Sequence, residues 1–176
     1  NPAEGYFPDE NYAREVMQLF SFGLIARNSN GSIRLGPNNL PIQTYDNDVI
    51  KEMAQVFTGL SFDMRVSNGQ MVRNNNFTLG NNFGNGFQFR WTEPMRFFND
   101  RHDNSEKVLF TDNGAQFIVP AGTPADQELD LVVDALVAHS STAPYVAERL
   151  LQGHWSLLVG YAALPWTVVA ALAVRQ

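Results

Sequence analysis

The sequence PDENYAREVMQLFSFGL, residues 8–24, has the pattern of a capped amphipathic helix. Asp9 or Asn11 offers a side-chain acceptor to the free N–H groups of a first helical turn. Apolar side chains recur at i, i+4, i+7 and i+8, as on one face of a helix: Tyr12, Val16, Leu19 and Phe20. We therefore predict a helix over residues 9–23 that is ended by Gly23.

The opposite face of this predicted helix is charged. Glu10 suits the positive end of the helix dipole, and its i, i+4 spacing to Arg14 allows the two side chains to pair. One interpretation is a solvated edge on a helix that packs through its apolar stripe. The other is that Glu10, Arg14 and Glu15 belong to a polar site.

A second helix is predicted from Asp46, its N-cap, to Thr58, with Gly59 ending it. Its expected buried stripe is Val49, Ile50, Met53, Ala54 and Phe57. A third helix is predicted to begin with Thr123 as N-cap and Pro124 as its first residue. Its expected stripe is Leu129, Val132, Val133, Leu136 and Val137. We expect the stripes of all three helices to share one interior.

A fourth helix is predicted after a break at residues 140–142, with Val146, Leu150 and Leu151 on its apolar side. Residues 25–45 are rich in Asn, Gly and Pro and predict a long ordered loop. The turn sequences at 68–69 and 112–114 predict two small β-hairpins. No internal repeat is apparent. The predicted fold is mainly α, an irregular helical domain with long Asn/Gly-rich loops and one or two small β-hairpins.

Aromatic and glycine residues are interleaved between the two predicted hairpins. The aromatic residues are Phe77, Phe83, Phe87, Phe89 and Trp91. Two interpretations remain open, since such side chains either stack on a ligand or hold a long loop against the helical body.

Four segments in series resemble the DUF1800 family, a large bacterial family of unknown function. They are PDENYAREVMQLFSFGL, PIQTYDNDVIKEMAQVFTGLSF, HDNSEKVLF and ELDLVVDALVAHSSTAPYVAERLLQ. The resemblance spans about residues 1–152, which we take as part of a single helical domain. Family members are much longer, so the resemblance implies a C-terminal fragment. It also implies an extracytoplasmic setting, periplasmic or secreted, because members often look exported.

Residues 153–176 depart from the family pattern and form an apolar tail. The segment 155–174 contains no charged residue and is long enough to cross a bilayer. Three interpretations remain open: a genuine membrane segment, a buried helix interrupted at Gly160 and Pro165, or a shifted reading frame. A membrane partner is expected only in the first case.

The composition excludes several classes of protein. A net charge of −6 argues against a nucleic-acid partner, which requires a basic face. The absence of cysteine excludes disulfides and thiolate metal sites. The motifs GxSxG, GxGxxG and the P-loop are also absent, so nothing in the sequence names a cofactor.

The strongest candidate for chemistry is His102-Asp103 with Lys107. A histidine beside an aspartate is able to bind a divalent metal or to act as an acid–base pair. No second histidine stands at a metal-binding spacing, so a metal is neither required nor excluded. The structural alternative is capping with a salt bridge to Arg101 or Lys107. We interpret His139 as structural, a cation favoured by the C-terminal end of a helix.

Two functions follow from these patterns. The first is a non-catalytic accessory or binding protein outside the cytoplasm, with a helical scaffold and loops that bind a partner protein or a glycan. The second is a hydrolase-like enzyme, with or without a metal, whose candidate catalytic residues are His102, Asp103, Lys107, Glu10, Arg14 and Glu15. The enzyme hypothesis requires these side chains to converge on one pocket.

Overall fold

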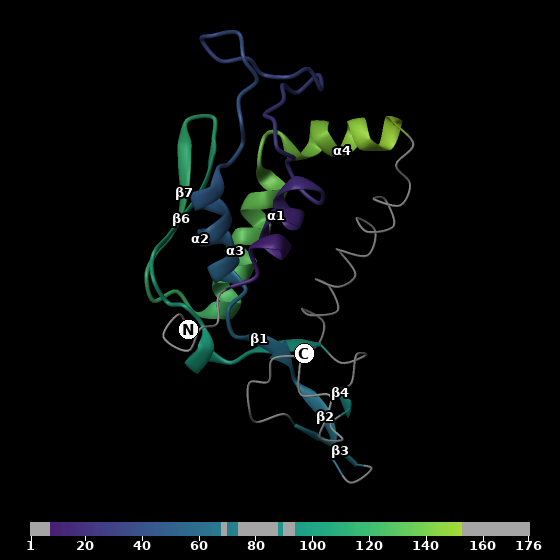
Figure 1. Cartoon of the computed structure of the whole chain (residues 1–176), viewed down its shortest axis with the longest axis vertical. Helices are drawn as coiled ribbons and strands as arrows, with labels where there is room; N and C mark the ends of the chain where they lie inside the picture. Colours follow the sequence, from purple (N-terminus) through teal and green to yellow (C-terminus); the bar gives the residue numbers. More distant parts are fainter. Residues whose placement is uncertain (1–7, 68–69, 74–87, 90–93, 153–176) are drawn as a thin grey trace.

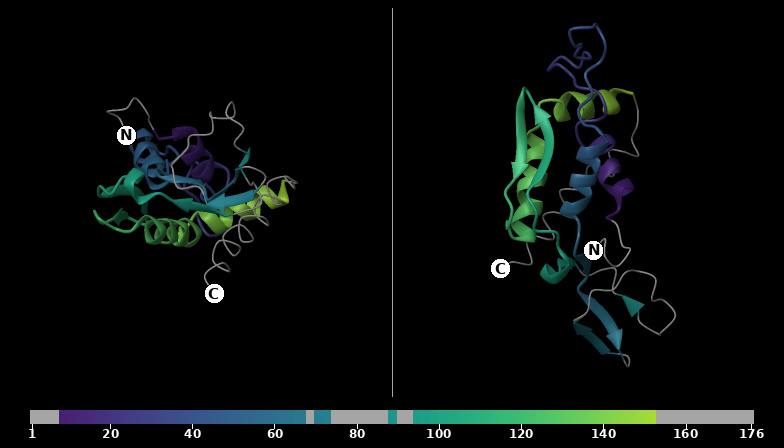
Figure 2. Two further views of the ribbon diagram at one scale, coloured as in Figure 1. Left: turned by 90° about the horizontal axis from the view of Figure 1, so that it is seen from below. Right: turned by 60° about the vertical axis from the view of Figure 1, so that its left-hand side comes forward.

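The computed structural model describes residues 8–67, 70–73, 88–89 and 94–152. Its α-helices are α1 (Glu10–Gln18), α2 (Asn47–Val56), α3 (Ala125–Ala138) and α4 (Thr142–Leu151). Its strands are β1 (Leu60–Phe62), β2 (Met64–Ser67), β3 (Gln70–Arg73), β4 (Gln88–Phe89), β5 (Met95–Phe97), β6 (Lys107–Asp112) and β7 (Ala115–Val119), and Asn99–Arg101 forms a 3-10 turn. Helices α1, α2 and α3 lie side by side with the β6–β7 hairpin along one flank, and α4 turns across one end (Figures 1 and 2).

The described strands form small antiparallel sheets, so the protein is mixed α and β, and the predicted mainly α fold is wrong. Strand β1 pairs with β5, which places Leu60 opposite Phe97. Strand β2 pairs with β3, as the turn at 68–69 predicts, and also with β4. The β1–β5 and β2–β4 pairings join segments that are far apart in the chain. Local periodicity does not reveal them, because only tertiary structure brings such segments together.

Helix α1 begins as predicted but ends early. The Asp9 carboxylate caps it by accepting from the N–H groups of Asn11 and Tyr12 at 3.0 and 3.1 Å. The helix stops at Gln18, five residues before Gly23, and its buried residues are Ala13 and Met17. Tyr12 is half exposed and instead packs edge-on against Phe57. The predicted apolar stripe is therefore not the buried face of α1. The helix buries only the narrow line, Ala13 and Met17, that faces α2.

Helix α2 follows its prediction closely. Asp46 is the N-cap and accepts from the N–H groups of Asp48 and Val49, each at 3.0 Å. The predicted N-cap of α3 is wrong, because the hydroxyl of Thr123 donates to the Pro120 carbonyl at 2.7 Å instead.

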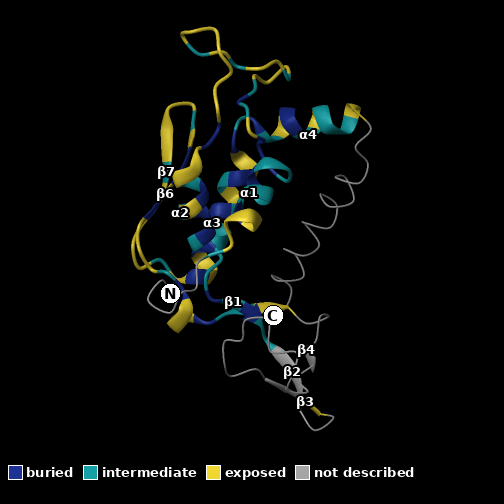
Figure 3. Cartoon of the chain, viewed as in Figure 1, coloured by how far each residue is buried: buried dark blue, intermediate teal, exposed yellow. Residues whose placement is uncertain are grey.

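The three helical stripes share one interior, as predicted. The buried cluster contains Ala13, Met17, Phe22, Tyr45, Ile50, Met53, Ala54, Val56, Leu109, Phe110, Val119, Val132 and Leu136. Figure 3 shows buried segments in α1, α2 and α3. Besides Tyr12, two further predicted core residues are wrong, since Val137 is 71% exposed and Leu151 is 89% exposed. Both lie on faces that no described element covers.

The predicted ordered loop is a closed structure that we call the β ring, residues 24–44. Three backbone hydrogen bonds form a cycle at its centre. The N–H of Ala26 donates to the Ile42 carbonyl, Ile42 donates to Arg34, and Arg34 donates to Ala26, at 2.9, 3.1 and 2.8 Å. Along the chain, Ala26, Arg34 and Ile42 follow one another at intervals of eight residues.

The same period of eight recurs in the rest of the β ring. Outer hydrogen bonds join Asn28 to Ser32, Gly36 to Leu40, and Thr44 to Leu24 at 2.8, 2.8 and 3.0 Å. Positive φ angles recur at Gly23, Gly31 and Asn39, with values of 74°, 84° and 60°. The backbone therefore has a threefold repeat that the side chains do not share, which is why the sequence shows no repeat.

The β ring is attached to α4 and to Ser141, the residue before it. The N–H of Arg27 donates to the Ser141 hydroxyl at 3.0 Å, and the Arg27 guanidinium forms an ion pair with Glu148. These contacts fix the ring relative to the helices, so the side chains that it carries are held in place.

Some sequence predictions fall outside the described residues. They are the turn at 68–69, the side chains of the interleaved aromatics at 77–91, and the tail at 153–176. Among the helices that the structure describes, none has the length and apolar content needed to span a membrane.

Candidate functional site

The structure places His102 in the interior, immediately after the 3-10 turn. Its Nδ1 lies 2.9 Å from the Thr58 carbonyl oxygen, and because a carbonyl only accepts, Nδ1 carries a hydrogen. Its Nε2 lies 3.4 Å from Oε2 of Glu128 on α3. The His102 side chain is 0% exposed, so both ring nitrogens face protein atoms.

Lys107 lies on β6 and is also 0% exposed. Its Nζ donates to the carbonyl oxygens of Asp103 and Ser105 at 2.6 and 3.2 Å. The same Nζ donates a hydrogen bond to Oε2 of Glu128 at 3.2 Å. It also lies 3.0 Å from Oε1, an ion-pair contact that lacks the geometry of a hydrogen bond. We call His102, Lys107 and Glu128 the buried charge cluster, which joins the turn before β6 to α3.

Asp103 lies beside this cluster, and its carboxylate is hydrogen-bonded to Ser105. The carboxylate accepts from the N–H and hydroxyl of Ser105 at 2.9 and 2.6 Å. Partial burial raises the pKa of Asp103, but these hydrogen bonds and the charge of Lys107 outweigh burial and leave that pKa below its ordinary value. Lys107 thus binds the Asp103 backbone, whereas the sequence predicted a salt bridge with a carboxylate nearby in the chain.

Glu10, Arg14 and Glu15 lie on α1. Arg14 and Glu15 are close enough to Tyr45 to shift its pKa, which burial raises above the ordinary value. Among the described residues, no hydrogen bond or ion pair joins the three α1 side chains to His102, Asp103 or Lys107. The structure therefore brings together three of the six predicted catalytic residues, and it adds Glu128, which the sequence did not single out. No group of three His, Asp or Glu side chains in the described ranges is placed to hold a metal ion.

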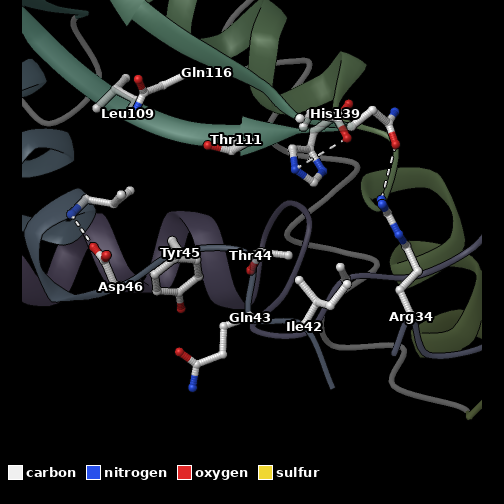
Figure 4. Close-up of a pocket in the computed structure, with 15 residues that line it drawn as sticks. Arg34, Ile42, Gln43, Thr44, Tyr45, Asp46, Leu109, Thr111, Gln116 and His139 are labelled. Carbon is white, nitrogen blue, oxygen red and sulfur yellow. Dashed lines mark hydrogen bonds and ion pairs between the residues drawn. The ribbon is translucent and has the colours of Figure 1, made fainter. Parts of the chain in front are cut away.

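A cleft of about 400 Å³ lies between the β ring and the β6–β7 hairpin (Figure 4). Its lining residues are Ala26, Arg34, Ile42, Gln43, Thr44, Tyr45, Asp46, Val49, Leu109, Thr111, Asp112, Asn113, Gly114, Gln116 and His139. All three residues of the central ring cycle are in this set. The ring therefore forms one wall of the cleft, and the hairpin forms the other.

One side chain bridges the two walls. Nη1 of Arg34, from the β ring, donates to Oδ1 of Asn113 in the hairpin turn at 3.2 Å (Figure 4). Asn113 and Gly114 have φ angles of 51° and 82°, as the predicted hairpin turn requires. The turn and the ring are thereby linked across the mouth by a single hydrogen bond between exposed groups.

Asp112 is held by the corner between α3 and α4. Its Oδ2 accepts from the N–H of Ser140 at 2.9 Å, and its Oδ1 accepts from the Ser140 hydroxyl. Partial burial raises the pKa of Asp112, but the hydrogen bonds from Ser140 and the nearby His139 outweigh burial and lower it. Asp112 is therefore an ionised carboxylate at neutral pH.

His139 is the C-cap of α3 and packs between the rings of Phe22 and Phe110. Its Nδ1 accepts from the N–H of Ser141 at 3.1 Å, so the neutral ring carries its hydrogen on Nε2. That Nε2 is buried, has no hydrogen-bond partner, and lies 3.9 Å from Oδ1 of Asp112.

The expectation that His139 is a cation is wrong. Burial lowers its pKa and outweighs Asp112 and the Thr111 carbonyl, both of which raise it. The sequence did not single out the pairing of Asp112 with His139. A hairpin turn and a helix end are each visible locally, but their meeting depends on how the elements pack.

Comparison with known proteins places the chain in one family. The family model described as "Protein of unknown function (DUF1800)" matches residues 2–165, which confirms the resemblance and extends it beyond residue 152. No curated protein and no solved structure matches the chain.

Proposed function

The chain belongs to the DUF1800 family, whose function is unknown, and we propose that it is a ligand-binding protein whose site is the cleft between the β ring and the β6–β7 hairpin. The observation that carries the proposal is a polar cavity of about 400 Å³ with a buried, unpartnered donor, Nε2 of His139, in its wall. Small-molecule sites are concave, mostly preformed and of about 300–1,000 Å³. Loops positioned by a rigid scaffold commonly carry such sites.

The geometry supports binding more than catalysis. An acid–base pair must reach its substrate within hydrogen-bond distance, but both nitrogens of His102 already face protein groups, Nδ1 the Thr58 carbonyl and Nε2 the Glu128 carboxylate. In the cleft, Ser140 donates to both oxygens of Asp112. A carboxylate engaged in this way is well suited to fix a neighbouring group and poorly placed to accept a proton from a substrate.

We extend the proposal to an accessory role outside the cytoplasm, with a partner protein or glycan as the source of the ligand. The family resemblance alone supports this setting. The net charge of −6 is consistent with such a ligand and disfavours nucleic acid as a partner.

A cavity-filling substitution tests the site. Thr111→Trp places an indole in the cleft from an exposed position on β6. Val108→Trp is the matched control, because Val108 is exposed on the same strand and is not among the lining residues. Amide chemical-shift perturbation with a library of small polar fragments is the measurement.

We expect fragments to shift resonances of lining residues such as Gln43 and Gln116, and we expect Thr111→Trp to abolish these shifts. The Val108→Trp control should bind as the parent does. Fragments that bind equally well to Thr111→Trp, or that never perturb the lining residues, would overturn the proposal.

A further inference from the structure

We propose that the cleft receives an uncharged carbohydrate, one oxygen of which accepts the Nε2–H of His139. This inference rests on the proposed function, since it names the class of ligand for the same cleft. Three observations carry it. They are the Nε2–H donor of His139, the charges of the residues that line the cleft, and the backbone hydrogen bonds already formed within the β ring.

The donor is the Nε2–H group of His139. Figure 4 shows the His139 imidazole projecting below β6 toward the wall that carries Thr44 and Ile42. Because Nδ1 accepts from Ser141, the hydrogen of the neutral ring lies on Nε2, where the Thr111 carbonyl is near enough to raise the pKa of the ring but does not complete a hydrogen bond. A buried donor without an acceptor is costly, and a ligand oxygen that reaches it removes the cost. Arg34 lines the same cleft and donates to Asn113 at 3.2 Å.

The charges of the lining then select the kind of oxygen. Asp112 is ionised and its Oδ1 lies 3.9 Å from Nε2 of His139, so an anionic oxygen at Nε2 would lie close to a carboxylate. The lining contains a second carboxylate, Asp46, and one guanidinium, Arg34, which is shared with Asn113. Like charges placed together are strongly unfavourable, so a neutral oxygen is preferred over a carboxylate or a phosphate.

The remaining side chains favour hydroxyl groups. The amides of Gln43, Asn113 and Gln116 each donate and accept, as a sugar hydroxyl does. Aliphatic side chains supply an apolar surface for the C–H faces of a sugar ring: Ile42, Val49 and Leu109. A site that combines a few polar groups with apolar surface is typical of small-ligand recognition.

A peptide fits the same cleft less well. Extended peptides bind by pairing their backbone with free strand edges. In the ring wall, the N–H and carbonyl groups of Ala26, Arg34 and Ile42 are already paired with one another in the central cycle. The central cycle of the ring wall therefore offers no free backbone ladder to a peptide.

The test is binding of defined probes to the full chain, followed by saturation-transfer NMR and calorimetry. The neutral probes are maltose, cellobiose and N,N′-diacetylchitobiose, the anionic probe is digalacturonic acid, and the peptide probe is trialanine. His139→Asn removes the Nε2–H donor while its amide oxygen remains able to accept from Ser141. Gln116→Ala removes an exposed lining amide, and Gln127→Ala is the control on the exposed face of α3.

We expect at least one neutral disaccharide to bind, with affinity at least tenfold lower in His139→Asn, lower in Gln116→Ala and unchanged in Gln127→Ala. Circular dichroism of each variant checks that it folds, and Gln116→Ala keeps the test decisive if His139→Asn does not fold. Tighter binding of digalacturonic acid, or unchanged sugar binding in both lining variants, would overturn the inference.

The two proposals fail in different ways. Trialanine in the cleft, or cleft binding by other fragments without any sugar, removes the carbohydrate class and leaves the ligand-binding function standing. A cleft that binds neither sugars nor fragments removes both.

Discussion

Two histidines of this protein each lie beside a carboxylate, and their surroundings make them opposites. His102 is enclosed, with Thr58 and Glu128 at its two nitrogens and Lys107 on the same carboxylate. His139 has one nitrogen satisfied by Ser141 and the other facing a cavity wall. The difference teaches that a His-Asp pair in the sequence does not mark a site, because the packing of distant elements decides which nitrogen is available.

The largest expected effect comes from opening the buried charge cluster. Lys107→Ala leaves the Glu128 carboxylate buried without its cation, and we expect the free energy of unfolding to fall by about 3–5 kcal/mol. Urea denaturation measures this change. The double variant Lys107→Met with Glu128→Leu should recover much of the loss, because it removes both charges together. A small effect of Lys107→Ala would mean that the cluster is open to water, and the contrast with the cleft would fail.

The next largest effect compares Gly23, just before the β ring, with the equivalent Gly31 inside it. Gly23→Ala places a Cβ 2.6 Å from the Tyr145 ring at a φ of 74°, whereas Gly31→Ala meets nothing within 4 Å at a φ of 84°. Both changes force a left-handed conformation that costs about 1–2 kcal/mol, and crowding adds about 1–3 kcal/mol at Gly23 alone. Thermal unfolding of the two variants is the measurement. Equal losses would contradict the close packing of the ring against α4.

A matched pair of substitutions compares the two histidines directly. His102→Asn removes a ring that is enclosed by partners, and we expect a loss of about 1–3 kcal/mol because Glu128 loses one of them. Both substitutions lose an aromatic contact, but His139→Asn preserves the acceptor for Ser141 and removes no polar group that has a hydrogen-bond partner, so we expect the smaller loss. Urea midpoints of the two variants provide the comparison. The reverse order would invert the assignment of structural and binding roles.

The smallest effect is a pH dependence. Burial holds the pKa of His139 below its ordinary value of 6.5, so below about pH 6.5 the unfolded state binds more protons than the folded state. The contribution of His139 to stability is therefore complete at higher pH and decreases as the pH falls from 6.5 through the folded pKa. The difference in unfolding free energy between the parent and His139→Asn, followed from pH 7.5 to 5, isolates this group. A difference that does not change with pH would show that His139 is open to solvent.

Local chemistry made several elements predictable. Asp9 and Asp46 cap their helices as expected, and the hairpin turn at residues 112–114 forms because Asn113 and Gly114 accept positive φ. Thr123 was misassigned because a carbonyl just before it competes for its hydroxyl. These successes and the failure all depend on groups within a few residues of one another.

Features that depend on distant contacts were not predictable. The sequence placed Lys107 with Asp103, but the cation meets Glu128, which is 21 residues away on α3. The repeat of the β ring lies in its backbone hydrogen bonds. Segments with different side chains form such bonds equally well, so the repeat does not show in the sequence. The cleft requires the ring, the hairpin and the α3–α4 corner to come together, and no local pattern encodes that meeting.

The closure of the β ring has a consequence for how this family is able to change. The N–H of Thr44 donates to the Leu24 carbonyl at 3.0 Å, so the two ends of the β ring lie next to each other. Such a segment is exchangeable as a cassette, since a short linker can join its two ends without displacing α1 or α2. The contacts forfeited would include those of Arg27 to α4 and that of Arg34 to Asn113. Longer or shorter cassettes would reshape one side of the cavity while the helical frame stays as it is.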